Sequence, residues 1–340
     1  MLKINHYLLF VIYVTFSVIT LGAYVRLTHA GLGCPDWPGC YGYLIGVPDN
    51  ALEIAKAENE FSGSVDIGKA WREMIHRYLA GFLGIFIFII SYIFYKNNTS
   101  KLFKLSVLIS FLVIIQALLG MWTVTLQLQP VIVMMHLVGG FTIISLLWIL
   151  FLRYNKNQYF NETDLLAKVT SKKIRKLSVF GYIALAVLII QIMLGGWTST
   201  NYAALACSDF PKCHGFWWPQ MDFYGAFIVE LATNLNYEFG RLDSPARVAI
   251  HFTHRVWAIV ATVMIFSLAI LSWRSINFSY QKLISTLLII ILFFQILLGI
   301  LNIKMSLPLY IAVAHNGNAA LLLICLITQL YLIRSVKKNL

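Results

Sequence analysis

REMIHRYLAGFLGIFIFIISYIFY, residues 72–95, is the stretch that decides the fold of this chain. It is almost entirely apolar, it is long enough to cross the hydrocarbon core of a bilayer, and it carries His76 near its start. Seven more apolar stretches of similar length cover residues 7–27, 105–126, 131–152, 178–198, 247–272, 283–303 and 309–333. The sequence therefore predicts an all-α integral membrane protein with eight transmembrane helices.

The composition excludes an ordinary soluble domain. The chain is 59% hydrophobic and 12% charged, whereas soluble domains carry about 25% charged residues. The first apolar stretch is too long for a secretory signal, and Arg26 follows it directly. No Arg-rich, Ser-rich transit segment precedes it, which favours a bacterial plasma membrane over an organelle.

The basic residues indicate the orientation in the membrane. The N-terminus, the connections 96–104, 153–177 and 273–282, and the C-terminus hold 16 of the 26 basic residues and only two acids. By the positive-inside rule, we expect both termini in the cytoplasm and the long loops 28–71 and 199–246 outside. The net charge of +12 thus reflects the basic residues on the cytoplasmic side of the membrane. We therefore expect no nucleic-acid partner.

An internal duplication divides the chain. Cys34-Pro-Asp-Trp-Pro-Gly-Cys40 matches Cys207-Ser-Asp-Phe-Pro-Lys-Cys213 at an offset of 173 residues, and His76-Arg77 matches His254-Arg255 at an offset of 178. Both copies start from the same side of the membrane. We therefore predict two four-helix bundles related as parallel repeats, with an N-terminal half at 1–153, a cytoplasmic linker at 154–177 and a C-terminal half at 178–340.

Four histidines occupy matching places in this arrangement. His76 and His136 are 60 residues apart, and His254 and His315 are 61 apart. From the helical rise, each lies roughly 8–12 Å below the outer boundary. A single intramembrane histidine often bonds a neighbouring backbone carbonyl, and zinc usually takes more than two ligands. Four at one depth instead favour two bis-imidazole heme sites, one per bundle.

The two predicted sites differ at one position. Glu73 lies three residues before His76 on the same helix face, and His251 holds the matching position before His254. A carboxylate beside a metal site is a candidate for proton transfer, although an interfacial glutamate is also favoured at a helix start by the dipole. We interpret the first half as the reacting site and the second as the holder of a permanent heme.

Three arginines lie at or near the outer helix ends: Arg26, Arg77 and Arg255. Their guanidinium groups are candidates for bidentate bonds to heme propionates, and interfacial snorkelling is the alternative.

The loop cysteines form two pairs on the outward side, where disulfides persist. The plain interpretation is two structural bridges, Cys34–Cys40 and Cys207–Cys213. The alternative is that Cys34 and Cys40 form a redox-active pair, since disulfides in short exposed loops are more easily reduced.

Taken together, the motifs resemble the heme A synthase family of cytochrome-oxidase assembly proteins. The segments that carry the resemblance, in chain order, are Gly31-Leu-Gly-Cys-Pro-Asp-Trp-Pro-Gly-Cys40, Glu73-Met-Ile-His-Arg77, His136-Leu-Val-Gly-Gly140, His251-Phe-Thr-His-Arg255 and His315-Asn-Gly. The resemblance spans nearly the whole chain. It implies conversion of heme O to heme A, by oxidation of a ring methyl to a formyl group through successive hydroxylations.

The resemblance also implies residue roles and partners. His76 and His136 would bind the substrate-side heme, His254 and His315 would bind heme b, and Glu73 would be catalytic. The family's outer-loop cysteine pair corresponds to Cys34 and Cys40. The expected partners are heme O, the lipid bilayer, an electron donor of unspecified kind and a farnesyltransferase-type membrane enzyme that delivers heme O. A homo-oligomer is compatible with the family.

Two other classes of protein share part of this pattern. A diheme membrane cytochrome b that passes quinol electrons would explain the histidine pairs but not the presence of Glu73 in one half only. A membrane thiol oxidoreductase would explain the cysteine pairs but not the four histidines. A heme transporter or chaperone is a further alternative.

Overall fold

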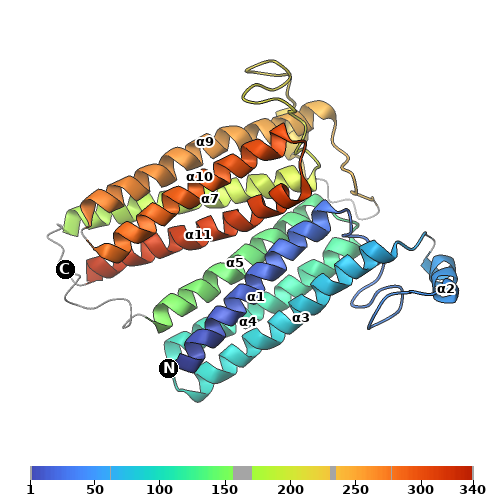
Figure 1. Ribbon diagram of the computed structural model, residues 1–340, viewed down its shortest axis with the longest axis horizontal. Helices are drawn as coiled ribbons and strands as arrows, with labels where there is room; N and C mark the ends of the chain where they lie inside the picture. The colour runs from blue at the N-terminus through green and yellow to red at the C-terminus, as the bar shows by residue number, and fades with distance from the viewer. Residues whose placement is uncertain (1, 62, 156–170, 230–234, 277, 339–340) are drawn as a thin grey trace.

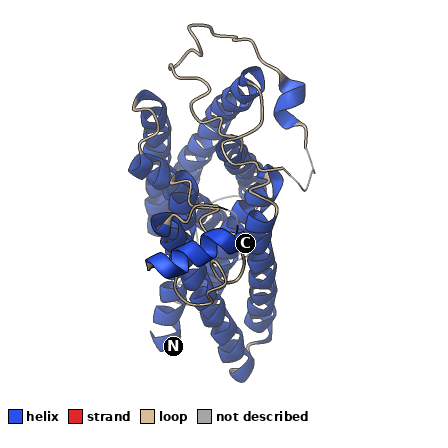
Figure 2. Ribbon diagram, turned by 90° about the vertical axis from the view of Figure 1, so that its right-hand side faces the viewer, coloured by secondary structure: helices blue, strands red, loops and turns tan. Residues whose placement is uncertain are grey.

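The structure is a computed structural model of the chain, and it describes residues 2–61, 63–155, 171–229, 235–276 and 278–338. Most of the predicted linker, residues 156–170, lies outside the described residues. In the described part of the chain, the regular secondary structure is helical (Figure 2). Two isolated β-bridges lie in loops.

The eight predicted transmembrane helices are confirmed in the described part of the chain, each long and apolar enough to cross a membrane. Their bounds are α1 Leu2–Leu27, α3 Ile67–Lys96, α4 Ser100–Thr125, α5 Pro130–Tyr154, α7 Ser171–Thr200, α9 Ser244–Ser275, α10 Ser279–Lys304 and α11 Leu309–Lys338. Helix α7 starts ahead of its apolar stretch, because the polar run after Ser171 contains lysine and arginine, which form helices well. The chain is thus a multi-pass membrane protein.

The helices pack in two groups of four (Figure 1). In the first group α1 contacts α3 and α5, and α4 contacts the same two helices. The second group repeats this cycle, with α7 and α10 each in contact with α9 and α11. The two groups meet where α1 packs on α11 and α5 packs on α7 and α11. This order is the one expected of two parallel-repeat bundles, and the repeat relation itself stays a prediction.

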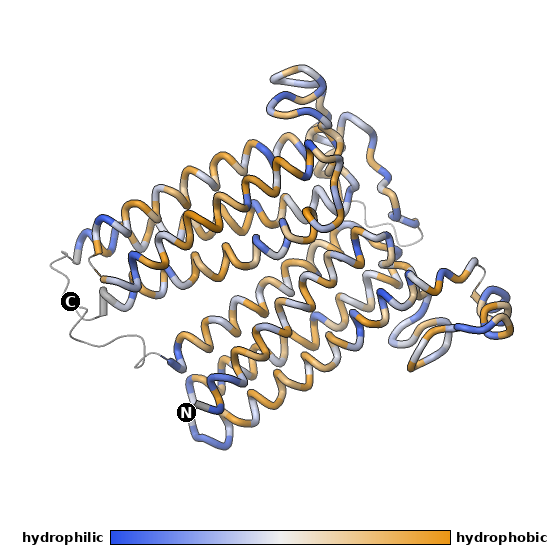
Figure 3. The backbone as a smooth tube through the Cα atoms, viewed as in Figure 1, coloured by the Kyte–Doolittle hydropathy of each residue, from blue (hydrophilic) through white to orange (hydrophobic). Residues whose placement is uncertain are grey.

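Polar segments gather at the ends of the helices, while their lengths are apolar (Figure 3). Apolar side chains such as Phe82, Ile259 and Phe293 are exposed on the outside of the bundle, which is the surface that lipid would cover. The start of α1 and the end of α11 lie at one end of the molecule (Figure 1). The opposite end carries two loop helices that the sequence did not indicate, α2 (Ala51–Phe61) and α8 (Phe223–Phe227).

Side chains from both groups join across the interface. The indole Nε1 of Trp148 on α5 donates to Thr328 Oγ1 on α11 at 2.7 Å.

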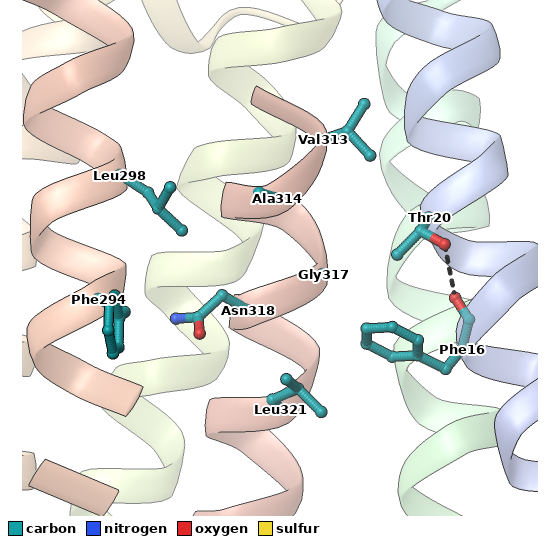
Figure 4. Close-up of a pocket in the computed structure, with 9 residues that line it drawn as sticks. All are labelled: Phe16, Thr20, Phe294, Leu298, Val313, Ala314, Gly317, Asn318 and Leu321. Carbon is teal, nitrogen blue, oxygen red and sulfur yellow. Dashed lines mark hydrogen bonds between the residues drawn. The ribbon is translucent and has the colours of Figure 1, made fainter. Parts of the chain in front are cut away.

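An apolar groove of about 340 Å³ runs between α1, α10 and α11 (Figure 4). Its lining residues are Phe16, Thr20, Phe294, Leu298, Val313, Ala314, Gly317, Asn318 and Leu321. Helix α1 therefore lies directly against the helix that carries His315.

Candidate functional site

The structure brings the four histidines together in the two predicted pairs. His76 on α3 lies within electrostatic range of His136 on α5, and His254 on α9 lies within the same range of His315 on α11. All four side chains are partly buried inside their helix group. Each half thus presents two imidazoles from helices that are not neighbours in the cycle of contacts, and a bundle can hold a cofactor between side chains on such facing helices.

A glycine on an adjacent helix lies against each imidazole. A Cβ added at Gly22 would lie 3.0 Å from Cε1 of His76, and one at Gly195 would lie 3.1 Å from Cε1 of His254. A Cβ added at Gly120 would lie 3.3 Å from Cε1 of His136, and one at Gly299 would lie 3.2 Å from Cε1 of His315. Because these distances are tighter than ordinary contacts, a side chain at any of the four would press on the ring. The glycines therefore set how close each imidazole stands to the next helix.

Glutamine amides hold three of the four rings. The Nε2 atoms of Gln116 and Gln191 lie 3.2 Å from Nδ1 of His136 and His254, and both also donate to the backbone carbonyl of the same histidine. Nε2 of Gln295 lies 3.4 Å from Nδ1 and 3.3 Å from Nε2 of His315. Each of these amide nitrogens is a donor, so the ring nitrogen that it meets is the acceptor. His76 differs, because none of the described residues hydrogen-bonds its buried Nδ1.

Glu73 is buried, with 4% of its surface exposed, and it faces the disulfide loop. One carboxylate oxygen forms an ion pair with Arg77 at 2.5 Å, and the other accepts a hydrogen bond from the backbone N–H of Cys34 at 2.9 Å. Arg77 in turn donates to the carbonyls of Asp36, Pro38 and Gly39. Glu73 therefore ties the loop to the helix turn that carries His76.

The second half builds the same junction with an imidazole. Nδ1 of His251 lies 3.2 Å from the backbone nitrogen of Cys207, and Nε2 lies 3.1 Å from Nε of Arg255. Both facing groups are donors, and a neutral imidazole accepts at only one of its nitrogens. Arg255 also donates to the carbonyls of Cys207 and Lys212. Glu73 and His251 thus occupy equivalent positions and face equivalent groups. What distinguishes the halves here is that the first junction contains an anionic side chain.

Both predicted disulfides are present, Cys34–Cys40 and Cys207–Cys213. The four cysteines of the bridges are at most 2% exposed, whereas the redox-active alternative relied on a short exposed loop. They are buried because each short loop folds back over the end of α3 or α9. In the second loop, backbone N–H groups of Gly215 and His214 hold the pKa of the Asp209 carboxyl below its ordinary value. These features favour a structural role for the bridges.

The three predicted arginines lie at the outer ends but bond to protein groups. Arg77 and Arg255 bond to the disulfide loops, as described above. Arg26 on α1 reaches the other half, where Nη2 donates to the carbonyl of Ser199 at 2.8 Å and the guanidinium lies 4.1 Å from the centre of the Tyr202 ring. The sequence did not indicate this link, because it joins segments 173 residues apart.

The donor set fits heme better than a small metal centre. Within the described ranges, no group of three or more His, Cys, Asp or Glu side chains comes together as a structural zinc site requires. Each half instead offers two imidazoles, each packed against a glycine of an adjacent helix. Fold and site together define a polytopic α-helical membrane protein with a pair of intramembrane histidines in each helix group.

Comparison with known protein families identifies the family of this membrane protein. The chain belongs to the COX15-CtaA family, described as cytochrome oxidase assembly protein, whose family model matches residues 5–327.

Several curated relatives extend over most of the chain. The heme A synthase of Shewanella oneidensis is 45% identical over 93% of this chain and 92% of its own length. The heme A synthases of Nitrosomonas eutropha and Flavobacterium psychrophilum are 25% and 26% identical, over 90% and 92% of this chain and 87% and 92% of their own lengths.

We expect alanine at Gly22 to weaken heme binding in the first half only, since the added methyl would press on His76. The measurement is the heme content and reduced absorption spectrum of the purified chain. Gly195→Ala should affect the second half in the same way. Gly81→Ala is the control, because a Cβ there has no heavy atom within 4 Å, and it should leave both signals unchanged. Equal effects of all three changes would contradict the assigned role of the glycines.

Replacing Cys34 and Cys40 together with serine should lower the stability of the first half by about 2 kcal/mol, because the bridge restricts the unfolded chain. The readout is thermal unfolding in detergent, compared with the same double change at Cys207 and Cys213. Similar losses from the two pairs would support structural bridges. Loss of turnover with unchanged melting, at the first pair alone, would contradict that role and support a redox-active pair.

Proposed function

We propose that this chain is a heme A synthase, an oxidoreductase that converts a ring methyl of heme O to the formyl group of heme A by successive hydroxylations. Its family and its relatives of that name support the proposal. The observation that carries it is the difference between two otherwise matching sites. Both halves place a glycine against each of two imidazoles, but among the described residues only the first half places a buried carboxylate one helix turn from one of these histidines.

The proposal assigns a different heme to each half. His76 and His136 hold the substrate heme O, and His254 and His315 hold a resident heme b. The matching places of the four histidines in the two halves, each packed against a glycine of an adjacent helix, support these assignments. Heme O carries an isoprenoid tail, so a site between helices that lipid surrounds suits it.

Bound heme supplies the iron-centred redox chemistry, and the protein positions the reacting ring and handles protons. Glu73 is the proposed proton acceptor, because it is the buried carboxylate nearest in sequence to the His76 turn. A proton taken up by its carboxylate would weaken the ion pair with Arg77, because the charge of Glu73 is then neutralised. Arg77 keeps three loop carbonyls as acceptors after such a change, so the loop stays anchored while Glu73 acts.

The cellular setting follows from the same proposal. The chain lies in the bacterial plasma membrane with both termini in the cytoplasm, and the disulfide loops face outward, where oxidising conditions preserve them. It receives heme O from a farnesyltransferase-type membrane enzyme, takes electrons from a donor and is compatible with a homo-oligomer.

The direct test is conversion of heme O by the purified full chain in the presence of oxygen and a reductant. Extracted hemes are separated by chromatography and identified by mass. We expect hydroxylated and formyl products to accumulate with time. Bound heme O that stays unchanged, while the hemes are reduced and reoxidised, would contradict the synthase and support a diheme electron-transfer cytochrome.

Glu73→Gln should lower product formation by about 10²-fold or more, the range typical for loss of an acid–base group. The spectrum of the second-half heme should not change, because His251 forms the matching junction there. Glu60→Gln, an exposed change on α2, is the control for loss of a carboxylate. Loss of both hemes in Glu73→Gln would show a structural role instead.

A further inference from the structure

The two disulfide loops carry matching apolar tips. Each loop turns back directly after its bridge, and the turn presents Leu44-Ile45 in the first half and Trp217-Trp218 in the second. The two pairs are related by the same offset of 173 residues as the bridges. The four side chains are 73% and 86% exposed in the first tip and 68% and 71% exposed in the second. Large apolar side chains gathered on an exposed surface indicate contact with lipid or with another protein.

The second tip lies against the outside of α9. The rings of Trp218 and Phe252 meet edge to face, with their centres 5.3 Å apart. Phe252 begins a row of side chains along one face of the helix, which continues with Val256, Ile259 and Val263. These three are exposed, so they belong to the surface that lipid covers. The loop itself projects to the side of α9 (Figure 1).

The first tip meets α3 in a similar way. The backbone N–H of Gly46, the residue after Ile45, donates to the hydroxyl of Tyr78 at 2.8 Å. Tyr78 also begins a row along one helix face, with Phe82 and Ile85 four and seven residues further on. Both of these are exposed on the outside of the helix group. The tip is therefore continuous with the lipid-facing side of α3.

Both contacts lie at the depth of the membrane. Tyr78 follows His76 by two residues, and Phe252 precedes His254 by two residues. The two contacted residues lie within the candidate membrane spans Ile67–Lys96 and Ser244–Ser275. A side chain that contacts such a residue from outside the bundle and stays exposed faces lipid. Tryptophan is also enriched where a bilayer meets water.

A lipid surrounding explains the tips better than a second protein does. Each tip extends a row that already faces lipid, whereas a protein partner would have to cover two separate tips in the plane of the bilayer. Lys212 Nζ lies 5.8 Å from the centre of the Trp217 ring. A cation beside the apolar tip suits the anionic phosphates of lipid headgroups.

We propose that both disulfide loops are seated in the bilayer leaflet on their own side of the membrane, with the side chains of the two tips among the phospholipids. The proposal does not depend on the proposed function, since no heme enters the argument. It gives the loops a mechanical role. Arg77 and Arg255 bond to the backbone of the loops, so a seated loop holds the outer part of α3 and of α9 at a fixed depth.

The test measures which solvent surrounds each tip. A nitroxide label is attached at Ile45→Cys or, separately, at Trp218→Cys in the full chain, reconstituted in phosphatidylethanolamine–phosphatidylglycerol vesicles. Cys325, which is free, is replaced with alanine in every variant. Collisions of the label with oxygen, which concentrates in lipid, are compared with those of a water-soluble nickel chelate present on both sides. We expect the oxygen-to-chelate ratio at both tips to be several-fold above that at Lys56→Cys, the control on the exposed face of α2.

Two outcomes would overturn the proposal. A chelate collision rate equal to that at Lys56→Cys would place the tips in water. A label reached by neither reagent would show that protein covers the tip, either a second copy or another partner. Brominated lipids supply a second measurement without any label. They should quench the tryptophan fluorescence of the wild type more than that of the double variant Trp217→Phe/Trp218→Phe, and equal quenching would contradict insertion of the second tip.

Discussion

Hydrocarbon offers an imidazole no water to bond, so the surroundings of each intramembrane histidine are set by the neighbouring helices. In this protein that requirement governs how the helices approach. His76 requires α1 to carry glycine where α3 passes it, and the other three rings impose the same condition on α4, α7 and α10. Three of those helices add a glutamine one turn away. The cycle of helix contacts in each half is thus organised around its pair of rings.

The outer loops are joined to these rings through a single helix turn. Glu73 and Arg77 connect the first disulfide loop to the part of α3 that carries His76, and His251 and Arg255 do so for His254. A rearrangement of the loop would therefore reach a proposed iron ligand within one turn. The same framework holds an anionic group in one half and an imidazole in the other, so a duplicated structure provides two sites with different chemistry.

The sequence predicts much of this structure, for identifiable reasons. Eight helices follow from apolar length, and the pairing of His76 with His136 follows from matched depth and duplication. The sequence also contains a glutamine four residues before each of Gly120, Gly195 and Gly299, a spacing that recurs within a half as well as between the halves. Other features depend on tertiary contact. The burial of Cys34 and Cys40, the reach of Arg26 to Ser199 and the loop bonds of Glu73 join segments that no local pattern connects.

The central claim is that one protein holds two hemes in similar sites and transforms only one of them. An experimental structure of the full chain loaded with heme O and heme b tests it most directly. The account predicts a planar density between the rings of each histidine pair, with an isoprenoid tail only on the heme between His76 and His136. A single heme, or a tail-bearing heme between His254 and His315, would contradict it.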